Sequence, residues 1–271
     1  MMTPRFSVIV NADDFGMSVP VNRAIAHCFA RELISSATLL ANFECFEEAC
    51  ETARNQKFAD RLGLHINLTE GRPLCPALSA NSRLCDADGN FRPHRGRFLS
   101  AQDSEQISEE VTAQVARCRK HGISLTHADS HQHVHNEPLV FPAVRRALRA
   151  ANVPFLRITR NLFPTDSRSL PKRLSKWMYN KAIELSGLRG TEFFGSVDDF
   201  ERQKHTPGWD RCSYEILTHP TFDQNGSLFD HVEHCLLEQK LERVFQGLRK
   251  QSYRDIAEIS AKQPKLSGGC S

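Results

Sequence analysis

The 271-residue chain lacks several signals that would assign a protein quickly to a functional class. It contains no glycine-rich dinucleotide fingerprint and no P-loop, so we expect no nucleotide cofactor. The net charge of +3 is too small and too evenly spread to favour nucleic acid or a membrane surface as a partner. The apolar run 6–10 is too short for a signal-peptide core or a membrane span. We therefore predict a cytoplasmic protein without a membrane span.

Cysteine is abundant, with nine residues, but the spacings of a metal or disulfide motif are missing. No C-x-x-C pair occurs, and the number of cysteines is odd. Cys28, Cys50 and Cys118 occupy apolar positions of helical patterns, where a thiol behaves as a small hydrophobe. We expect reduced thiols with a structural role. Cys75 and Cys85 share a loop and remain the one pair that could form a disulfide.

Strand and helix patterns alternate along most of the chain, with short apolar segments followed by amphipathic stretches. Repeated units of this kind predict a parallel sheet covered by helices, either an open doubly wound sheet or a closed barrel. Strands are expected at 6–10, 36–42, 62–68, 125–129, 155–159, 191–194 and 214–218. Helices are expected at 18–29, 46–53, 103–120, 141–151 and 177–186, with a long final helix at 231–250.

The positions of the polar residues favour the barrel. Seven charged or imidazole side chains lie at or just after the C-terminal ends of expected strands, where (β/α) barrels assemble their active sites. These residues are Asp13, Asp14, His65, Asp129, His131, Arg157 and His219. We therefore predict a distorted (β/α) barrel of about seven parallel strands with outer helices, formed by a single domain over 1–261. The polar, glycine-rich tail 262–271 is expected to be disordered.

Two adjacent carboxylates, Asp13 and Asp14, follow the first apolar strand within Asn11–Gly16. Adjacent like charges repel and raise one pKa, so a protein that needed only stability would avoid the pair. One arrangement that tolerates the pair binds one carboxylate to a metal and leaves the other free as a base. This arrangement also requires ligands from elsewhere in the chain.

Histidines supply those ligands. A divalent ion that activates water needs a few protein ligands and an open coordination position. Asp14 offers a carboxylate oxygen and His65 one imidazole, and the second imidazole comes from the cluster 131–135. Within that cluster His131 lies nearest the strand end and is the predicted ligand. His133 and His135 are left to bind substrate or to support the ligands.

Four short motifs together resemble the YdjC-like carbohydrate deacetylase family, which includes chitooligosaccharide deacetylases and a deacetylase of hopanoid biosynthesis. The motifs are NADDFG at 11–16, GLHINL at 63–68, DSHQHVH at 129–135 and His219-Pro220. The resemblance implies a distorted (β/α) barrel that binds one divalent metal ion per chain, such as Mg²⁺ or Zn²⁺. It also implies the removal of acetyl groups from N-acetylated mono- or oligosaccharides, or from a glycolipid, and a possible homodimer.

The resemblance also implies roles for individual residues. Asp14, His65 and His131 would bind the metal, Asp13 would act as the general base, and His219 would act on the leaving amine. Arg157 lies in a segment that follows the family pattern only loosely, and a substrate contact is expected there. Asp129 either orients a histidine or caps the structure locally; it is grouped with Arg157, His133 and His135 as a candidate substrate-binding residue.

Two long segments, 69–101 and 161–203, follow strand ends on the same face and are expected to form the walls of a sugar cleft. Their candidate contacts are Arg72, Arg92, Arg95, Arg97 and Trp177. Other functional classes stay open at this point. They are a metal-dependent phosphoesterase on the same barrel, a non-catalytic sugar- or metal-binding protein, and an oxygenase that holds ferrous iron in the same triad.

Overall fold

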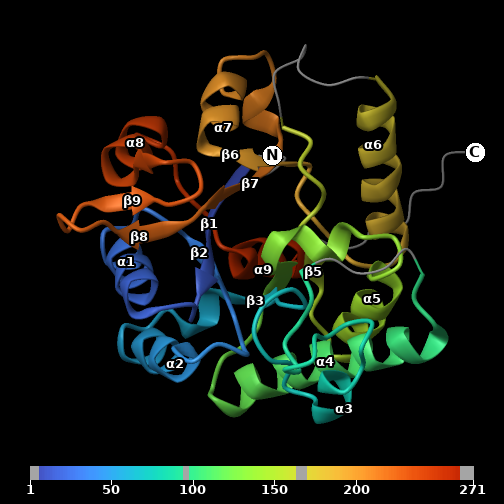
Figure 1. Ribbon diagram of the computed structural model, residues 1–271. Helices are drawn as coiled ribbons and strands as arrows, with labels where there is room; N and C mark the ends of the chain where they lie inside the picture. The colour runs from blue at the N-terminus through green and yellow to red at the C-terminus, as the bar shows by residue number, and fades with distance from the viewer. Residues whose placement is uncertain (1–5, 94–97, 163–169, 263–271) are drawn as a thin grey trace, which may run out of the picture.

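The computed structural model describes residues 6–93, 98–162 and 170–262 (Figure 1). Arg95, Arg97, residues 163–169 of the second expected wall and residues 263–271 of the expected tail 262–271 fall outside these residues. The described chain forms a curled parallel sheet with helices around its outside, which confirms the predicted distorted barrel (Figure 1). Among the described residues, no helix combines the length and apolarity needed to cross a bilayer.

Seven parallel strands build the sheet, in the order β5-β4-β3-β2-β1-β7-β6. Their bounds are β1 Ser7–Phe15, β2 Ser36–Leu39, β3 Leu62–Ile66, β4 His127–Ser130, β5 Phe155–Leu156, β6 Phe193–Ser196 and β7 Ser213–Thr218. The two edge strands, β5 and β6, are connected through the segments beside them. Arg189 exchanges backbone hydrogen bonds with the β5 region, and the amides of Asn161 and Leu162 donate to the Phe194 carbonyl. This indirect closure explains why the barrel is distorted.

Helices follow the strands as the amphipathic patterns predict. The longer ones are α1 Val19–Ala30, α2 Phe46–Asn55, α4 Ala101–Lys120, α5 Phe141–Ala150 and α6 Leu170–Leu185, with α7 Val197–Gln203 and the single turn α3 Pro76–Ser79. Short 3-10 turns occur at η1 Ala59–Arg61, η2 His131–Asn136 and η3 Trp209–Arg211. Ser100 and Asp103 form a reciprocal capping box that starts α4, whereas Ser18 precedes α1 without a side-chain cap.

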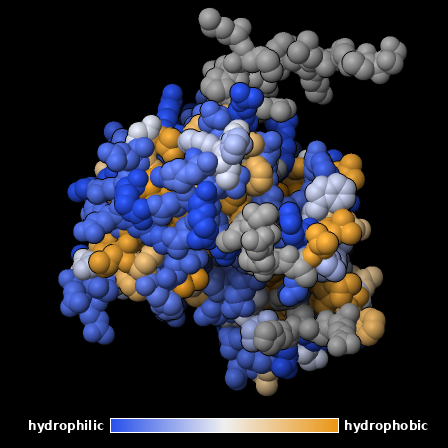
Figure 2. Space-filling view, turned by 90° about the horizontal axis from the view of Figure 1, so that it is seen from above, coloured by the Kyte–Doolittle hydropathy of each residue, from blue (hydrophilic) through white to orange (hydrophobic). Residues whose placement is uncertain are grey.

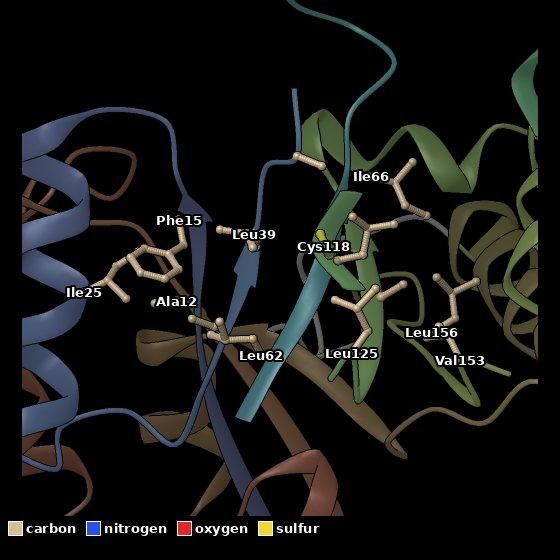
Figure 3. Close-up of a cluster of buried hydrophobic side chains, with 14 of the residues drawn as sticks. Ala12, Phe15, Ile25, Leu39, Leu62, Ile66, Cys118, Leu125, Val153 and Leu156 are labelled. Atoms are coloured by element: carbon tan, nitrogen blue, oxygen red, sulfur yellow. The ribbon is translucent and has the colours of Figure 1, made fainter. Parts of the chain in front are cut away.

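A continuous apolar core fills the space between strands and helices. Side chains of the strands, such as Leu39 and Leu62, pack with side chains of the surrounding helices and loops, such as Ile25 and Cys118 (Figure 3). The described cysteines are free thiols, including Cys75 and Cys85, so those two do not form a disulfide. Seen from above, the surface is mostly hydrophilic and is broken by separate apolar patches (Figure 2).

The predicted long helix at 231–250 is wrong. Residues 220–236 form a small antiparallel sheet of β8 Pro220–Phe222, β9 Leu228–Asp230 and β10 Cys235–Leu236, and only then do α8 Leu237–Val244 and α9 Tyr253–Lys262 follow. The turn after β9 is closed by the Asp230 carboxylate, which accepts the backbone amides of Val232 and Glu233. His234 adopts a left-handed conformation (φ 51°), which no helix interior tolerates.

Candidate active site

The backbone of β1 brings both aspartates to one place. Side chains of a regular strand alternate between its two faces, so adjacent carboxylates would normally point apart. At Asp14 the backbone is left-handed (φ 66°), and the register against β2 shifts between Ala12 and Phe15. Gly16 then continues with φ 95°. This bulge re-aims the second side chain. Both carboxylates are buried, Asp13 at 2% and Asp14 at 3% exposure.

Asp14, His65 and His131 converge, as the sequence predicts. The Asp14 Oδ1 atom lies 3.1 Å from His65 Nε2 and 3.0 Å from His131 Nδ1. His65 is on β3, and His131 opens the 3-10 turn η2 directly after β4. Left-handed backbone at Gln132 and His133 coils this turn, so the three alternating histidines diverge instead of facing one way.

Each of the two imidazoles has a second polar partner. His65 Nδ1 lies 2.7 Å from Asp129 Oδ1 and 3.1 Å from the Thr38 hydroxyl. His131 Nε2 lies 3.2 Å from Glu70 Oε2. Such partners fix which ring nitrogen carries the proton and which one faces the centre of the site.

The electrostatics favour positive charge where the three side chains meet. Burial opposes ionisation of Asp14, but hydrogen bonds from His131 and His65 outweigh it and hold the pKa of this carboxyl well below its usual range. Burial also disfavours an imidazolium at His65, yet Asp129 and Asp14 raise its pKa to about 10. A cation placed among these atoms would benefit from the same field.

The donor set fits a divalent metal ion. Two donor atoms that bind one ion at about 2.1 Å each lie roughly 3.0–3.4 Å apart, which matches the separations at Asp14. One carboxylate oxygen and two imidazole nitrogens are also the ligand types of catalytic zinc sites. A second cluster, Asp13 with His65 and Asp129, is close enough to hold an ion, but a guanidinium already occupies it.

That guanidinium belongs to Arg157, which is fully buried beneath the aspartates. It donates to both oxygens of Asp13 and contacts Asp129 Oδ2 at 2.7 Å. Its Nε atom donates to Glu215 on β7 over 2.7 Å, and Tyr253 of α9 donates to the other oxygen of Glu215. Arg157 and Asp129 therefore support the site from below, and in this structure neither presents its side chain to a ligand at the surface.

His219 lies close to Asp13 and directly precedes β8. Its Nε2 atom is 3.8 Å from Asp13 Oδ2, and its Nδ1 atom is 3.8 Å from Asp230 Oδ1 without a hydrogen bond. The Asp230 carboxylate also accepts the backbone amide of His219. The His219 imidazole thus lies between the carboxylates of Asp13 and Asp230, and its Nε2 atom faces Asp13.

The other two histidines of the cluster have different surroundings. His135 is fully buried, with Nδ1 near the Ser130 hydroxyl and Nε2 3.1 Å from the Arg157 carbonyl oxygen. It thus ties the η2 turn to the segment that directly follows β5 and does not face the site. His133 is exposed and packs edge-on against Phe194 (ring centroids 6.0 Å apart), which leaves it accessible to a ligand.

The described parts of the two expected cleft walls, 69–101 and 161–203, place three of the candidate contact residues. In the first, Arg72 donates to the Asp88 carbonyl and Arg92 to the carbonyls of Ser82 and Cys85, so both arginines also hold their own loop together. In the second, Trp177 is exposed on α6 and lines a cavity of about 870 Å³. None of the Asp14, His65 and His131 side chains lines that cavity.

Sequence reasoning missed two residues of the site, Glu70 and His231. Glu70 follows β3 and reaches His131, and His231, expected on a solvated helix, lies 3.9 Å from Asp14 Oδ2 through its Nε2. The Nδ1 atom of His231 lies 3.0 Å from the His219 carbonyl oxygen. The available signal was the short segment 228–230 followed by a histidine, but the apolar spacing of the residues after it suggested a helix.

The fold and the site define a (β/α)-barrel protein with an Asp-His-His cluster, a candidate metal site, at the C-terminal ends of its strands. The family model described as YdjC-like protein matches residues 7–258, and the chain belongs to this family.

Relatives named carbohydrate deacetylase support the assignment. The one from Brevibacillus brevis is 38% identical over 215 residues, covering 79% of this chain and 81% of the relative. The one from Geobacillus stearothermophilus is 40% identical over 151 residues, and the match spans 56% of this chain and only 59% of the relative. A crystal structure of a candidate cellobiose-phosphate cleavage protein from Enterococcus faecalis superposes with a TM-score of 0.67 at 22% identity. It covers 92% of this chain and 98% of its own, and supports the fold.

Proposed function

We propose that the protein is a metal-dependent carbohydrate deacetylase, which hydrolyses the acetamide of N-acetylated sugars. The observation that carries the proposal is the arrangement around β1. Asp14, His65 and His131 form a site for one cation, while Asp13 and His219 lie beside it without belonging to the ligand set. The relatives named carbohydrate deacetylase point to the same substrate class.

Amide hydrolysis sets three requirements that these residues can meet. The amide carbon is a poor electrophile and the amine a poor leaving group, so the reaction needs an activated water, a stabilised oxyanion and a proton for the nitrogen. A divalent ion held by Asp14, His65 and His131 would supply Lewis acidity toward water and the carbonyl oxygen. The remaining tasks are proton transfers, which fall to groups that are not ligands.

Asp13 and His219 divide these proton transfers. Asp13 accepts a proton from the attacking water as the new carbon–oxygen bond forms. His219 delivers a proton to the sugar nitrogen as the carbon–nitrogen bond breaks, giving acetate and a free amine. Arg157 keeps Asp13 ionised and fixed in orientation, and Asp230 holds His219 in place. The pathway contains no covalent enzyme intermediate, and no serine or cysteine nucleophile is assigned to the site.

The number of ions separates this proposal from a phosphoesterase. Two-metal phosphoesterases hold ions a few ångström apart through several bridging ligands. Here the second possible cluster is filled by Arg157, so we propose one ion, Mg²⁺ or Zn²⁺, per chain. A metal content near two per chain would favour the phosphoesterase. The homodimer and the cytoplasmic location stay predictions.

The direct test is a screen of N-acetylated mono- and oligosaccharides for acetate release, with Mg²⁺ or Zn²⁺ and with a chelator. We expect acetate from at least one sugar, loss of turnover with chelator and recovery on adding metal back. The Asp14→Asn variant serves as the control for contaminating activity. No acetate from any sugar with either metal would overturn the proposal.

A further inference from the structure

The loop that follows β3 reaches a predicted metal ligand. Glu70 Oε2 lies 3.2 Å from His131 Nε2, while the Nδ1 atom of the same ring lies 3.0 Å from Asp14 Oδ1. Both ring nitrogens of His131 are therefore occupied. Both partners are carboxylate acceptors, so the two ring nitrogens become distinct only when a cation lies beside Asp14: Nδ1 would then turn its lone pair to the ion, and Nε2 would keep the hydrogen that Glu70 accepts.

The other imidazole of the site is arranged in the same way with the nitrogens exchanged. His65 turns Nε2 toward Asp14 and Nδ1 toward Asp129, which is fully buried. Each histidine thus has one nitrogen at the centre of the site and a carboxylate on the other. A carboxylate behind a metal-binding histidine fixes the tautomer and increases the basicity of the ligand nitrogen.

The backbone of Glu70 is held rigidly although its side chain is half exposed. The buried Asn67 side chain accepts hydrogen bonds from the backbone amides of Thr69 and Glu70 and donates to the backbone carbonyl of Glu70. The side chain of Gln114 on α4 in turn bonds to the backbone amide and the backbone carbonyl of Asn67. The position of Glu70 is therefore set by the core, and only its side chain has freedom to move.

We propose that Glu70 is a positioning residue: it holds His131 with Nδ1 toward the metal and couples the loop after β3 to the metal site. The inference rests on the proposed function, since it assigns a partner to one of the proposed ligands. It has a consequence for substrate binding. The loop 69–101, which is expected to contact the sugar, thus carries near its start the residue that orients a metal ligand, so a substrate contact that displaces the Glu70 side chain would alter the support of His131.

Metal affinity tests the proposal without relying on turnover. Zn²⁺ binding is measured by competition with a chromophoric chelator for the wild type, Glu70→Ala and Glu70→Gln. We expect about a 10–100-fold loss of affinity in Glu70→Ala. Glu70→Gln retains an acceptor oxygen for His131 Nε2 and should lose less. Asp88→Asn removes an exposed carboxylate from the same loop and controls for the change in net charge.

The outcomes distinguish this inference from the function beneath it. Unchanged Zn²⁺ affinity in a folded Glu70→Ala variant would overturn the positioning role, and a raised KM with unchanged affinity would place Glu70 on the substrate instead. If Asp88→Asn lost as much Zn²⁺ affinity as Glu70→Ala, the effect would come from the charge of the loop, and the positioning role would be overturned. If the wild type itself binds no divalent metal, the proposed function fails. Thermal unfolding with chelator present confirms that each variant is folded.

Discussion

Arg157 donates to both carboxylate oxygens of Asp13, over 2.6 and 2.7 Å, in a fully buried setting. Burial alone would raise the pKa of Asp13, but the guanidinium outweighs it and holds that pKa well below its usual range. Asp13 is therefore ionised and fixed in orientation at any ordinary pH. Such a carboxylate is a weak base, so in the proposed role it would need a strongly acidified water. An ion bound at Asp14 would supply that acidity.

The first prediction separates the two adjacent aspartates. Asp14→Ala should lose metal and activity together, because it removes a ligand and its charge. Asp13→Asn should keep the metal and lose about 10²–10⁴-fold in kcat, since an amide cannot accept the proton of water. Elemental analysis beside kcat measures both effects.

Backbone conformation requires a further control for this pair. Asp14 is left-handed, a conformation that asparagine tolerates better than alanine. Asp14→Asn should therefore lose metal without the added backbone strain. If Asp13→Asn emptied the site while both Asp14 variants stayed filled, the two roles would be reversed.

His219→Ala should retain metal and lose turnover according to the leaving group. Its proposed task is to protonate the departing amine, so N-acetylated sugars should suffer a loss of about 10²-fold or more. An acetate ester with a good leaving group, such as 4-nitrophenyl acetate, needs no such proton and should suffer much less. Equal losses on both substrates would remove His219 from the acid role.

Arg157→Met should destabilise the fold, because it leaves Asp13, Asp129 and Glu215 buried without their shared cation. Breaking a buried ion pair costs about 3–5 kcal/mol, which lowers the thermal midpoint by roughly 6–20 °C. Differential scanning calorimetry measures the shift. Arg146→Met, which removes an exposed pair with Glu105, should change the midpoint little.

Arg157→Lys should alter the pH profile rather than only the stability. Lysine keeps the charge but cannot donate to both oxygens of Asp13 and to Glu215 together, so the pKa of Asp13 should rise. A general base works in its ionised form, and the acidic limb of kcat/KM should therefore move to higher pH. A lower thermal midpoint with an unmoved limb would assign Arg157 a structural role alone.

The grouping of the three candidate ligands could be predicted from the sequence because the C-terminal ends of parallel strands lie at the same edge of a sheet. Asp14, His65 and His131 meet there for that reason. The same reasoning cannot tell a side chain that faces the opening from one that lies beneath it. Arg157 and Asp129 also sit at strand ends, yet they are fully buried.

The sequence also could not reveal contacts made through backbone conformation or between distant segments. The left-handed residue Asp14 breaks the alternation that a strand pattern assumes. His231 reaches the site only because Asp230 closes a turn and ends the strand β9, against an apolar spacing that is typical of a helix. Glu70 meets His131 across 61 positions of the chain, a pairing that no local pattern encodes.

The helix α9 is connected to Asp13 through a chain of buried side chains. Tyr253 stacks on His127, the first residue of β4, and donates to Glu215, which in turn accepts from Arg157 behind Asp13. A change at Tyr253 would thus be felt as altered acid–base behaviour at a carboxylate it never touches. Truncating or fusing the chain near α9 is therefore expected to disturb the buried contacts behind Asp13, although α9 itself does not contact that residue.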